Sequence, residues 1–238
     1  MKTDHTGFTL VEMAIVLAII AFILGAGLTL LAAQQDQRRI EDTNALLIAA
    51  NEALIGFALS QTPPYLPCPD KTSATGTGTA NDGQEDRTTL GSCVVQEGNL
   101  PWVTLGLTPQ TDAWSNRLRY RVTDHFSNSS TGIQLTFVGD INVYDSAAAV
   151  NSIVTAVPAV IVSHGKNGLG AINATGMPNA AAVASADEQA NAPVSIVGHT
   201  TFVSHSANPA ESGYFDDQLI WLSQYTLFNR MVQAGKLP

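Results

Sequence analysis

The stretch Gly7-Phe8-Thr9-Leu10-Val11-Glu12 decides the fold of the N-terminal part of the chain, because an apolar run without charged side chains follows it at residues 13–33. As a helix that rises about 1.5 Å per residue, this run reaches across the roughly 30 Å hydrocarbon core of a bilayer. A helix is suited to that setting because it satisfies its own backbone groups where water is absent. We therefore expect residues 8–33 to form a transmembrane helix.

Glu12 is an ionisable residue at the mouth of this apolar run. Such a group is costly in a membrane and normally has a partner. Cleavage between Gly7 and Phe8 would create an α-amino group that lies too close in sequence to reach its own Glu12 easily along a helix. It can reach the Glu12 of a neighbouring copy, so the stretch is predicted to act both as an anchor and as an assembly device.

The same residues resemble the class III signal of type IV pilins and of the pseudopilins of type II secretion. The resemblance implies that a prepilin peptidase cuts after Gly7 and N-methylates Phe8, and that Glu12 pairs with the amine of a neighbouring subunit. It also implies an assembly platform, an ATPase and other pilin or pseudopilin subunits as partners. The resemblance further implies a topology with the N-terminus in the cytoplasm, the helix in the inner membrane and the globular domain in the periplasm. After assembly, the protein would be in a filament or at the cell surface.

Other readings of the N-terminal stretch explain it less well. An ordinary secretory signal has an apolar region of about 7–15 residues followed by its cleavage site, whereas here the run is longer and the expected cut precedes it. A plain signal anchor does not require Glu12. Arg38 and Arg39 beyond the run slightly favour the opposite orientation by the positive-inside rule, but acidic residues surround them, and we follow the motif.

The composition fits an extracytoplasmic protein. The chain has 238 residues, a net charge of −9 and 13% charged residues. Without leader and anchor about 200 residues remain, enough for one domain with a core. The acidic balance argues against a general nucleic-acid partner, which requires a basic face. We expect a leader at residues 1–7, the membrane helix at 8–33, an extracytoplasmic helix at 34–62 and a globular domain at 63–238.

The helix is expected to continue beyond the membrane. Ile40, Leu47 and Leu54 recur every seven residues, with Ala50 and Phe57 between them, and such an apolar stripe is typical of an amphipathic helix packed on a domain. A coiled coil is the alternative, but two or three heptads are weak evidence for one. The prolines at positions 63 and 64 end the helix.

The two cysteines, Cys68 and Cys93, form an even pair in a compartment expected to be oxidising. Between them, residues 71–86 are polar and have no apolar periodicity, which predicts a surface loop. A bridge that closes about 26 residues stabilises the fold by roughly 3.5 kcal/mol in the chain-entropy model. A structural disulfide is favoured over redox chemistry because the cysteines are far apart in sequence.

The remaining pattern predicts an antiparallel sheet. Residues 117–124 alternate, with Leu118, Tyr120 and Val122 on one face and arginines on the other, which is typical of a half-buried strand. Further strands are expected at residues 133–144, with a turn at Gly139-Asp140, and at 157–162 and 194–203. Residues 163–170 form a glycine-rich loop, residues 173–192 a loop or short helix, and residues 224–234 a terminal helix capped by Ser223.

The predicted fold class is therefore α+β. One long N-terminal helix, half in the membrane and half packed on the domain, covers an antiparallel sheet. A disulfide-closed loop and a short C-terminal helix complete the layout, which is similar to the pilin architecture.

Two further stretches resemble major pseudopilins. Asp112-Ala113-Trp114-Ser115-Asn116, followed by Tyr120, is similar to their Asp-x-Trp-Gly-Asn motif, with Ser115 in place of the glycine. The loop at 163–168 together with Asp216, Asp217 and Trp221 resembles their C-terminal calcium loop. Calcium prefers carboxylate and carbonyl oxygens, so the candidate ligands are Asp216, Asp217 and Asn167, with backbone carbonyls near Ser163. The alternative is ordinary turn chemistry.

A second acidic set, Asp70, Asp82 and Asp86, lies in the disulfide loop and is a weaker candidate for calcium. A hydrolase triad assembled from Ser163, one of the histidines and Asp216 has no supporting motif around the serine. We therefore expect no catalysis.

The predicted function is that of a filament subunit, either a pseudopilin of type II secretion or a minor type IV pilin. A membrane-anchored extracytoplasmic binding protein that does not form filaments is the alternative. Copurification with filaments separates the two.

Overall fold

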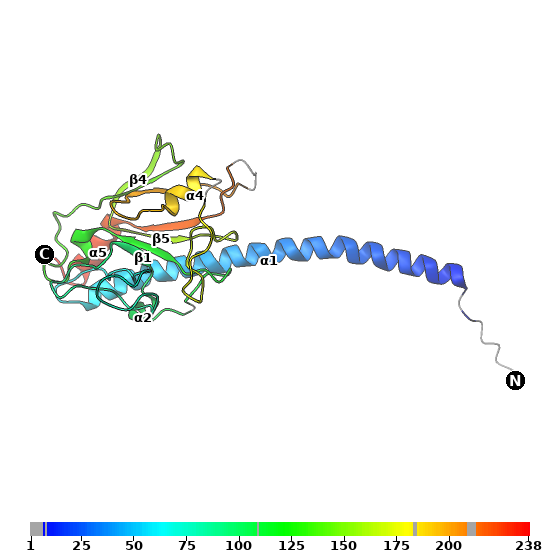
Figure 1. The fold of residues 1–238 in the computed structure, drawn as a ribbon, viewed down its shortest axis with the longest axis horizontal. Helices are drawn as coiled ribbons and strands as arrows, with labels where there is room; N and C mark the ends of the chain where they lie inside the picture. The colour runs from blue at the N-terminus through cyan, green and yellow to red at the C-terminus, as the bar shows by residue number, and fades with distance from the viewer. Residues whose placement is uncertain (1–6, 8, 109, 183–184, 209–212) are drawn as a thin grey trace. The chain divides into compact units, whose positions relative to one another are not determined.

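The computed structural model describes residue 7 and residues 9–108, 110–182, 185–208 and 213–238, with the backbone alone for residues 23–31. A single helix, α1, runs over Leu10–Ser60. The chain divides into two compact units, Met1–Glu41 and Asp42–Pro238. The first contains the N-terminal part of α1, and the second contains the rest of α1 and all the other elements (Figure 1).

In the N-terminal unit, the side chains of α1 from Leu10 to Phe22 are exposed, and all of them except Glu12 are apolar. By length and composition, one described helical segment meets the requirement of a membrane span, Ala32–Ser60, and Leu10–Phe22 is a shorter apolar segment. Leu47 and Leu54 lie within the first of these segments and belong to the globular core. The apolarity of that segment therefore serves packing, and the span expected at residues 8–33 stays a prediction.

The globular unit is built in three layers (Figure 1). The middle layer is a four-stranded antiparallel sheet in the order β1-β2-β5-β7. Its strands are Glu97–Asn99, Arg119–Val122, Ala159–Ser163 and Gln218–Leu222. One face packs on α1 and the other on a second sheet, because successive side chains of a strand point to opposite faces.

The main core lies between α1 and this middle sheet. Leu47, Ala50 and Leu54 are fully buried there, as the seven-residue stripe predicts, and they pack with Tyr120 and Ile161 of the sheet. The terminal helix α5, Gln224–Gln233, adds its buried residues Leu227 and Met231. Val232 of the same helix is exposed.

The second sheet has the order β4-β3-β6, with strands Ser152–Val157, Ile141–Tyr144 and Thr201–Val203. Its β3–β4 pair is antiparallel and its β3–β6 pair is parallel, so the expected sheet is in fact two sheets. Ile141, Val143 and Phe202 bury one face against Val160 and Val162 of the middle sheet.

The expected strand bounds need two corrections here. Residues 133–140 are not strand, because the amide of Ile133 bonds to the carbonyl of Pro64 and the chain turns at Phe137. The strand expected at 194–203 is limited to Thr201–Val203, because Val194 and Val197 face solvent instead of a core.

The arginine face of β2 is also not the solvent face that alternation predicts. Arg117 and Arg121 are buried. Each arginine of the face meets a carboxylate: Arg117 and Asp70 at 3.9 Å, Arg119 and Glu97 at 2.5 Å, and Arg121 and Asp140 at 2.8 Å. Long polar side chains are therefore accommodated between the layers as ion pairs, which periodicity does not reveal.

Three short helices complete the unit: α2 at Trp102–Leu105, α3 at Asp124–Ser127 and α4 at Ala186–Asn191. The α4 helix lies within the region expected to be loop or short helix, and its N-cap Ser185 accepts the amide of Glu188. The predicted α+β class, with the long helix, the antiparallel sheet, the disulfide and the short C-terminal helix, is confirmed.

Candidate functional site

The start of α1 is fixed by a reciprocal pair of hydrogen bonds. The backbone amide and the hydroxyl of Thr9 donate to Glu12 Oε2 at 2.8 and 2.9 Å, and the amide of Glu12 donates to Thr9 Oγ1 at 3.2 Å. This is a capping box, in which Thr9 caps the helix and Glu12 occupies the third helical position. Sequence reasoning missed this role of Thr9, although the Thr-x-x-Glu spacing carries the signal.

The capping box presents Glu12 at the exposed beginning of the helix, two residues beyond its first residue Leu10. Within the described part of the chain, the carboxylate bonds to Thr9 and pairs with no lysine or arginine. Gly7 precedes the helix as an exposed, non-helical residue. Phe8, the expected new N-terminus, lies outside the described residues.

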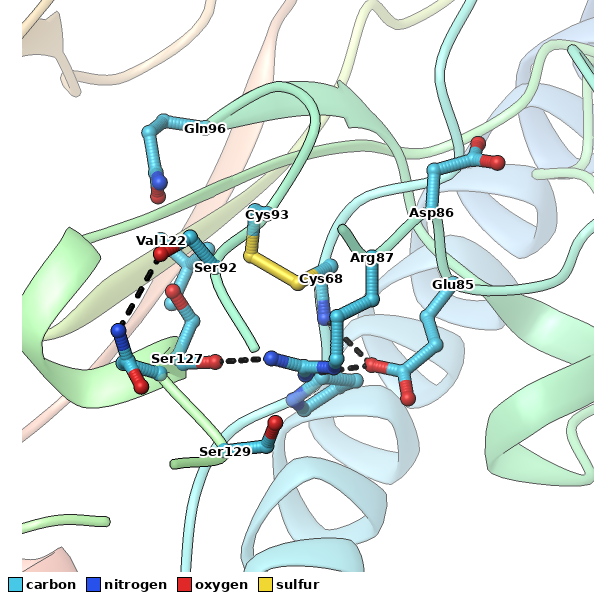
Figure 2. The surroundings of a disulfide bond; sticks show 12 residues. Cys68, Glu85, Asp86, Arg87, Ser92, Cys93, Gln96, Val122, Ser127 and Ser129 are labelled. Atoms are coloured by element: carbon cyan, nitrogen blue, oxygen red, sulfur yellow. Dashed lines mark hydrogen bonds and ion pairs between the residues drawn. A yellow bond between two sulfur atoms is a disulfide. The ribbon is translucent and has the colours of Figure 1, made fainter. Parts of the chain in front are cut away.

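The predicted disulfide is present: Cys68 and Cys93 are bonded, with their Cα atoms 5.2 Å apart (Figure 2). Arg87 lies beside it, where its guanidinium contacts Glu85 Oε2 at 2.7 Å and the carbonyls of Gly91 and Ser127. Glu85 in turn accepts the amide of Cys68 at 2.9 Å. The bridge and the ion pair together hold the two ends of the loop on the domain.

A buried lysine organises the interior of this loop, and the sequence reading did not single it out. Lys71 is fully buried, and its ammonium group donates to the carbonyls of Thr75, Gly76 and Thr77 at 3.2, 3.0 and 2.9 Å. Its backbone amide donates to Asp86 Oδ2 at 2.8 Å. The loop therefore wraps around a cation supplied by its own sequence.

The weaker acidic set in this loop is used for backbone bonding. Asp70 accepts the amides of Asn81 and Gly83, and burial raises its pKa to about 6. Asp82 accepts the amide of Gln84. These carboxylates act as turn residues, as the alternative of ordinary turn chemistry predicts.

The C-terminal candidate site brings three carboxylates together. Ligand atoms of Glu188, Asp216 and Asp217 all lie within 4.8 Å of one another, and this is the one such group among the described residues. The aspartates precede β7, and Glu188 comes from α4. Glu188 was missed by the sequence reasoning because it is 28 residues away in sequence from Asp216.

The surroundings of the cluster leave its charges poorly compensated. Asp216 Oδ1 and Asp217 Oδ1 are buried and have no hydrogen-bond partner. Burial, together with the charges of both aspartates, raises the pKa of Glu188 to about 7, and burial raises that of Asp216 as well. Two buried carboxylates and one half-buried carboxylate, with one buried oxygen of each aspartate lacking a hydrogen bond, are a donor set that fits a hard divalent cation such as calcium.

Asn167, the third predicted ligand, lies beside the cluster in a different role. Its amide nitrogen donates to Glu188 Oε1 at 2.8 Å, and its backbone amide donates to Asp216 Oδ2 at 2.9 Å. Its side-chain oxygen accepts the amide of Leu169. In this arrangement Asn167 offers donors to the carboxylates and orients them, so a ligand role for its oxygen requires the side chain to turn.

A chain of buried polar groups leads from the cluster into the middle sheet. His164 Nδ1 lies 3.5 Å from Asp217 Oδ1, and Arg119 Nε donates to His164 Nε2 at 3.1 Å. Ser163, which a hydrolase triad would use, donates to Asp112 Oδ2 at 2.6 Å and is fully buried. Ser163 and His164 therefore bond to different residues and not to each other. They do not form the serine–histidine pair that a serine nucleophile requires.

The Asp112 turn supports the neighbouring glycine-rich loop. Asp112 Oδ1 accepts the amides of Trp114 and Asn116, both at 2.9 Å, and Asn116 donates to the carbonyl of Gly165. Ser115 has a φ of 68°, the left-handed conformation that favours glycine. Ser115, which stands where the similar motif has glycine, therefore adopts a backbone conformation that favours glycine.

Residues 2–28 match the family model of the prokaryotic N-terminal methylation motif. This is the signal motif of type IV pilins and pseudopilins, and it covers Gly7, Phe8, Thr9 and Glu12. No curated protein and no solved structure matches the chain.

The motif supports a type IV pilin-like or pseudopilin protein and suggests a structural filament subunit. It implies processing by prepilin peptidase and assembly with other pilin subunits. Together with the apolar N-terminal helix, it fits a membrane-anchored protein.

Proposed function

We propose that the chain is a pseudopilin of type II secretion or a minor type IV pilin, cleaved after Gly7 and N-methylated on Phe8. The observation that carries the proposal is the methylation motif at the start of an apolar helix. The expected machinery is an inner-membrane assembly platform and its ATPase, with the globular unit in the periplasm until a filament forms.

Assembly is proposed to depend on Glu12. After cleavage, a neighbouring subunit's Phe8 amine supplies the cation that Glu12 does not receive from the described residues of its own chain. Pairing offsets the desolvation that both groups otherwise bear in an apolar bundle. A displaced subunit leaves both charges unmatched, so the pair sets axial register as well as affinity.

Because of the capping box, the charge of Glu12 can be removed without disturbing the start of the helix. Glutamine also completes a capping box, so Glu12→Gln keeps the helix start and removes the charge. We expect this variant to be cleaved and membrane-bound but to enter the filament fraction at least about tenfold less than wild type, because the neighbour's amine is then a buried charge without a partner, which costs more than about 1.4 kcal/mol. Glu41→Gln, which changes an exposed acid of the same helix, is the matched control and should assemble normally.

Intact mass of the membrane-extracted protein tests the processing step. We expect a chain that begins at Phe8 with one added methyl group. A mature chain that begins at Met1, or after residue 33, contradicts the pilin proposal. A Glu12→Gln filament fraction equal to that of wild type, with normal processing, contradicts the role of Glu12 alone.

We further propose that Asp216, Asp217 and Glu188 hold a calcium ion in the globular unit. The support is the group of orphaned, buried carboxylate oxygens. When bound, calcium would supply the positive charge that this cluster lacks and tie α4 to the start of β7. Isothermal titration of the calcium-depleted full chain in detergent tests this proposal, with Asp217→Asn expected to abolish binding. Absence of binding to the parent contradicts it.

A further inference from the structure

A cavity of about 320 Å³ lies in the globular unit, where the middle sheet meets the loops that follow β5 and α4. The sheet side contributes charged side chains to its lining, namely Glu97, Arg117 and Arg119. The loops contribute apolar residues, namely Ile172, Pro178, Pro193, Val194 and Ile196. Apolar walls with a few fixed polar groups are typical of small-molecule sites, and this volume is at the lower end of their range. The cavity therefore has the size for a small molecule and not for a polypeptide segment.

Arg117 is the charged group of this lining with the weakest compensation. Its side chain is 7% exposed, and its contact with a carboxylate, Asp70 Oδ2, is 3.9 Å long. Asp70 is itself bonded to the amides of Asn81 and Gly83, and burial raises its pKa to about 6, so it is a weak counterion. In the described part of the chain, Arg117 Nε has no hydrogen-bond partner. A buried cation without a close counterion is costly, so the cavity favours an anion.

Neutral groups hold the guanidinium of Arg117 in place. It donates to the carbonyls of Asn81 and Ala174 at 2.7 and 3.2 Å, and it stacks on the ring of Trp102 at 4.4 Å. These contacts position the group but bring no negative charge to it. An anion that enters the cavity therefore meets an oriented guanidinium and does not have to break a hydrogen-bonded ion pair.

The other two charged groups of the lining already satisfy each other. Arg119 donates to Glu97 Oε1, to His164 Nε2 and to the carbonyl of Gly170. Glu97 Oε2 lies 2.7 Å from His199 Nδ1, so both oxygens of this carboxylate are occupied. Among the described residues of the lining, a cationic ligand would therefore find no free carboxylate.

We propose that this cavity binds a small carboxylate with a short apolar chain. The carboxylate lies beside the guanidinium of Arg117, whose planar N–H groups match its two oxygens, and the chain lies against Ile172, Pro178 and Ile196. An inorganic anion would compensate Arg117 but would leave the apolar lining facing water. Val194 lines the cavity and is fully exposed, so the apolar surface continues to the opening.

The apolar lining also supplies a driving force. A cavity of this volume has room for about ten water molecules at roughly 30 Å³ each. Waters beside apolar walls have few hydrogen-bond partners, and affinity increases when an apolar group displaces such poorly ordered water. Butanoate is small enough for this volume and combines the two features, so it is a suitable probe.

Amide chemical shifts of the nitrogen-15-labelled full chain in detergent micelles test the proposal, in calcium-free buffer so that the carboxylate cluster binds no metal. We expect butanoate to shift the amides of Gly98 and Gly170, which line the cavity, with a Kd of about 1 mM or below. Butylammonium and 1-butanol are controls of similar size. They should bind at least about tenfold more weakly, because neither compensates Arg117. Inorganic phosphate, which lacks the apolar chain, should also bind more weakly.

A charge series at Thr72 tests the sign of the ligand without changing the core. Thr72 is exposed and lines the cavity. Thr72→Glu should weaken butanoate binding about threefold and Thr72→Lys should strengthen it about threefold, because a charge near the opening acts through a high dielectric. Thr72→Gln has the size of glutamate without its charge, so it is the matched control and should bind like the parent.

A substitution at Arg117 tests the anchor itself. Arg117→Gln should weaken binding at least about tenfold. Arg121→Gln removes another buried arginine, which pairs with Asp140 and does not line the cavity, so it controls for the loss of a buried guanidinium and should bind like the parent. Where Arg117→Gln does not fold, the Thr72 series decides.

Four results overturn the proposal. The first is the absence of saturable shifts at Gly98 and Gly170 up to tens of millimolar butanoate. The second is equal binding of 1-butanol or butylammonium, which indicates a cavity without preference for an anion. The third is equal binding of phosphate, which indicates an adventitious ion only. The fourth is equal affinity of Thr72→Glu and Thr72→Lys, which places the ligand elsewhere. None of these measurements depends on cleavage or filaments, so failure here is distinguishable from failure of the proposed function.

Discussion

The disulfide loop and the C-terminal loop of the globular unit solve the same electrostatic problem in opposite ways. In the disulfide loop, the ammonium group of Lys71 is buried among three carbonyls, and a covalent bridge closes the ends. In the C-terminal loop, three carboxylates converge, and two of their buried oxygens accept no hydrogen bond. The first loop contains its own cation, whereas the second has the donor set for a cation from solution.

This difference teaches that acidic composition alone does not identify a metal site. Both loops contain several acids and turn-forming residues, and the sequence favoured the second loop only through its resemblance to a calcium loop. The structure separates them by the use of each carboxylate oxygen. Asp70 and Asp82 accept backbone amides, whereas Asp216 and Asp217 each keep one buried oxygen without a hydrogen bond, that of Asp217 lying 3.5 Å from His164 Nδ1.

The largest expected effect comes from the covalent bridge. The double variant Cys68→Ser, Cys93→Ser removes a link across a sequence separation of 25 residues, and we expect its free energy of unfolding to fall by about 3.5 kcal/mol. Guanidinium denaturation of the full chain in detergent measures this. A loss below about 1 kcal/mol would show that Arg87 and Lys71 hold the loop without the bridge.

Calcium is expected to have the next largest effect, and on the other loop. At a calcium concentration about 100 times the Kd, the globular unit should gain about 2.7 kcal/mol, or roughly 5–10 °C in melting temperature for a chain of this size. Magnesium at the same concentration is the control ion, because it demands shorter, octahedral coordination. An equal response to both ions would indicate general charge screening.

The pH dependence of the calcium-free protein sharpens this prediction. The pKa of Glu188 is raised from 4.5 to about 7, so the native state holds a proton that the unfolded state has lost. The stabilising contribution of this proton is complete below pH 4.5 and disappears as the pH rises through 7. Glu188→Gln should remove this part of the pH dependence, and calcium should restore the parent's stability at pH 8.

Loss of the internal cation should have the smallest effect of the three. Lys71→Met keeps the buried chain length but leaves the carbonyls of residues 75–77 without a donor, and we expect a loss of about 2 kcal/mol. Amide exchange should accelerate in residues 71–86 and stay unchanged around Asp216. Lys236→Met, which removes two contacts of a more exposed ammonium, is the matched control and should cost under about 1 kcal/mol.

The sequence by itself determined the elements whose physics is local. The apolar run predicted the helix with which α1 begins, and the seven-residue stripe identified Leu47 and Leu54 as core. The cysteine pair and the terminal helix also followed from sequence. Each of these depends on neighbours within one or two turns, or on the even number of cysteines.

Only the tertiary structure decided features that join distant segments. Alternation could not show that the arginine face of β2 is covered, because the carboxylates that pair with it come from residues 70, 97 and 140. It could not distinguish one sheet from two, since β3 and β6 are far apart in sequence and pair in parallel. Sequence periodicity also could not show that Glu188 lies beside Asp216 and Asp217. Burial and charge act through space, whereas periodicity reflects only the local geometry of the chain.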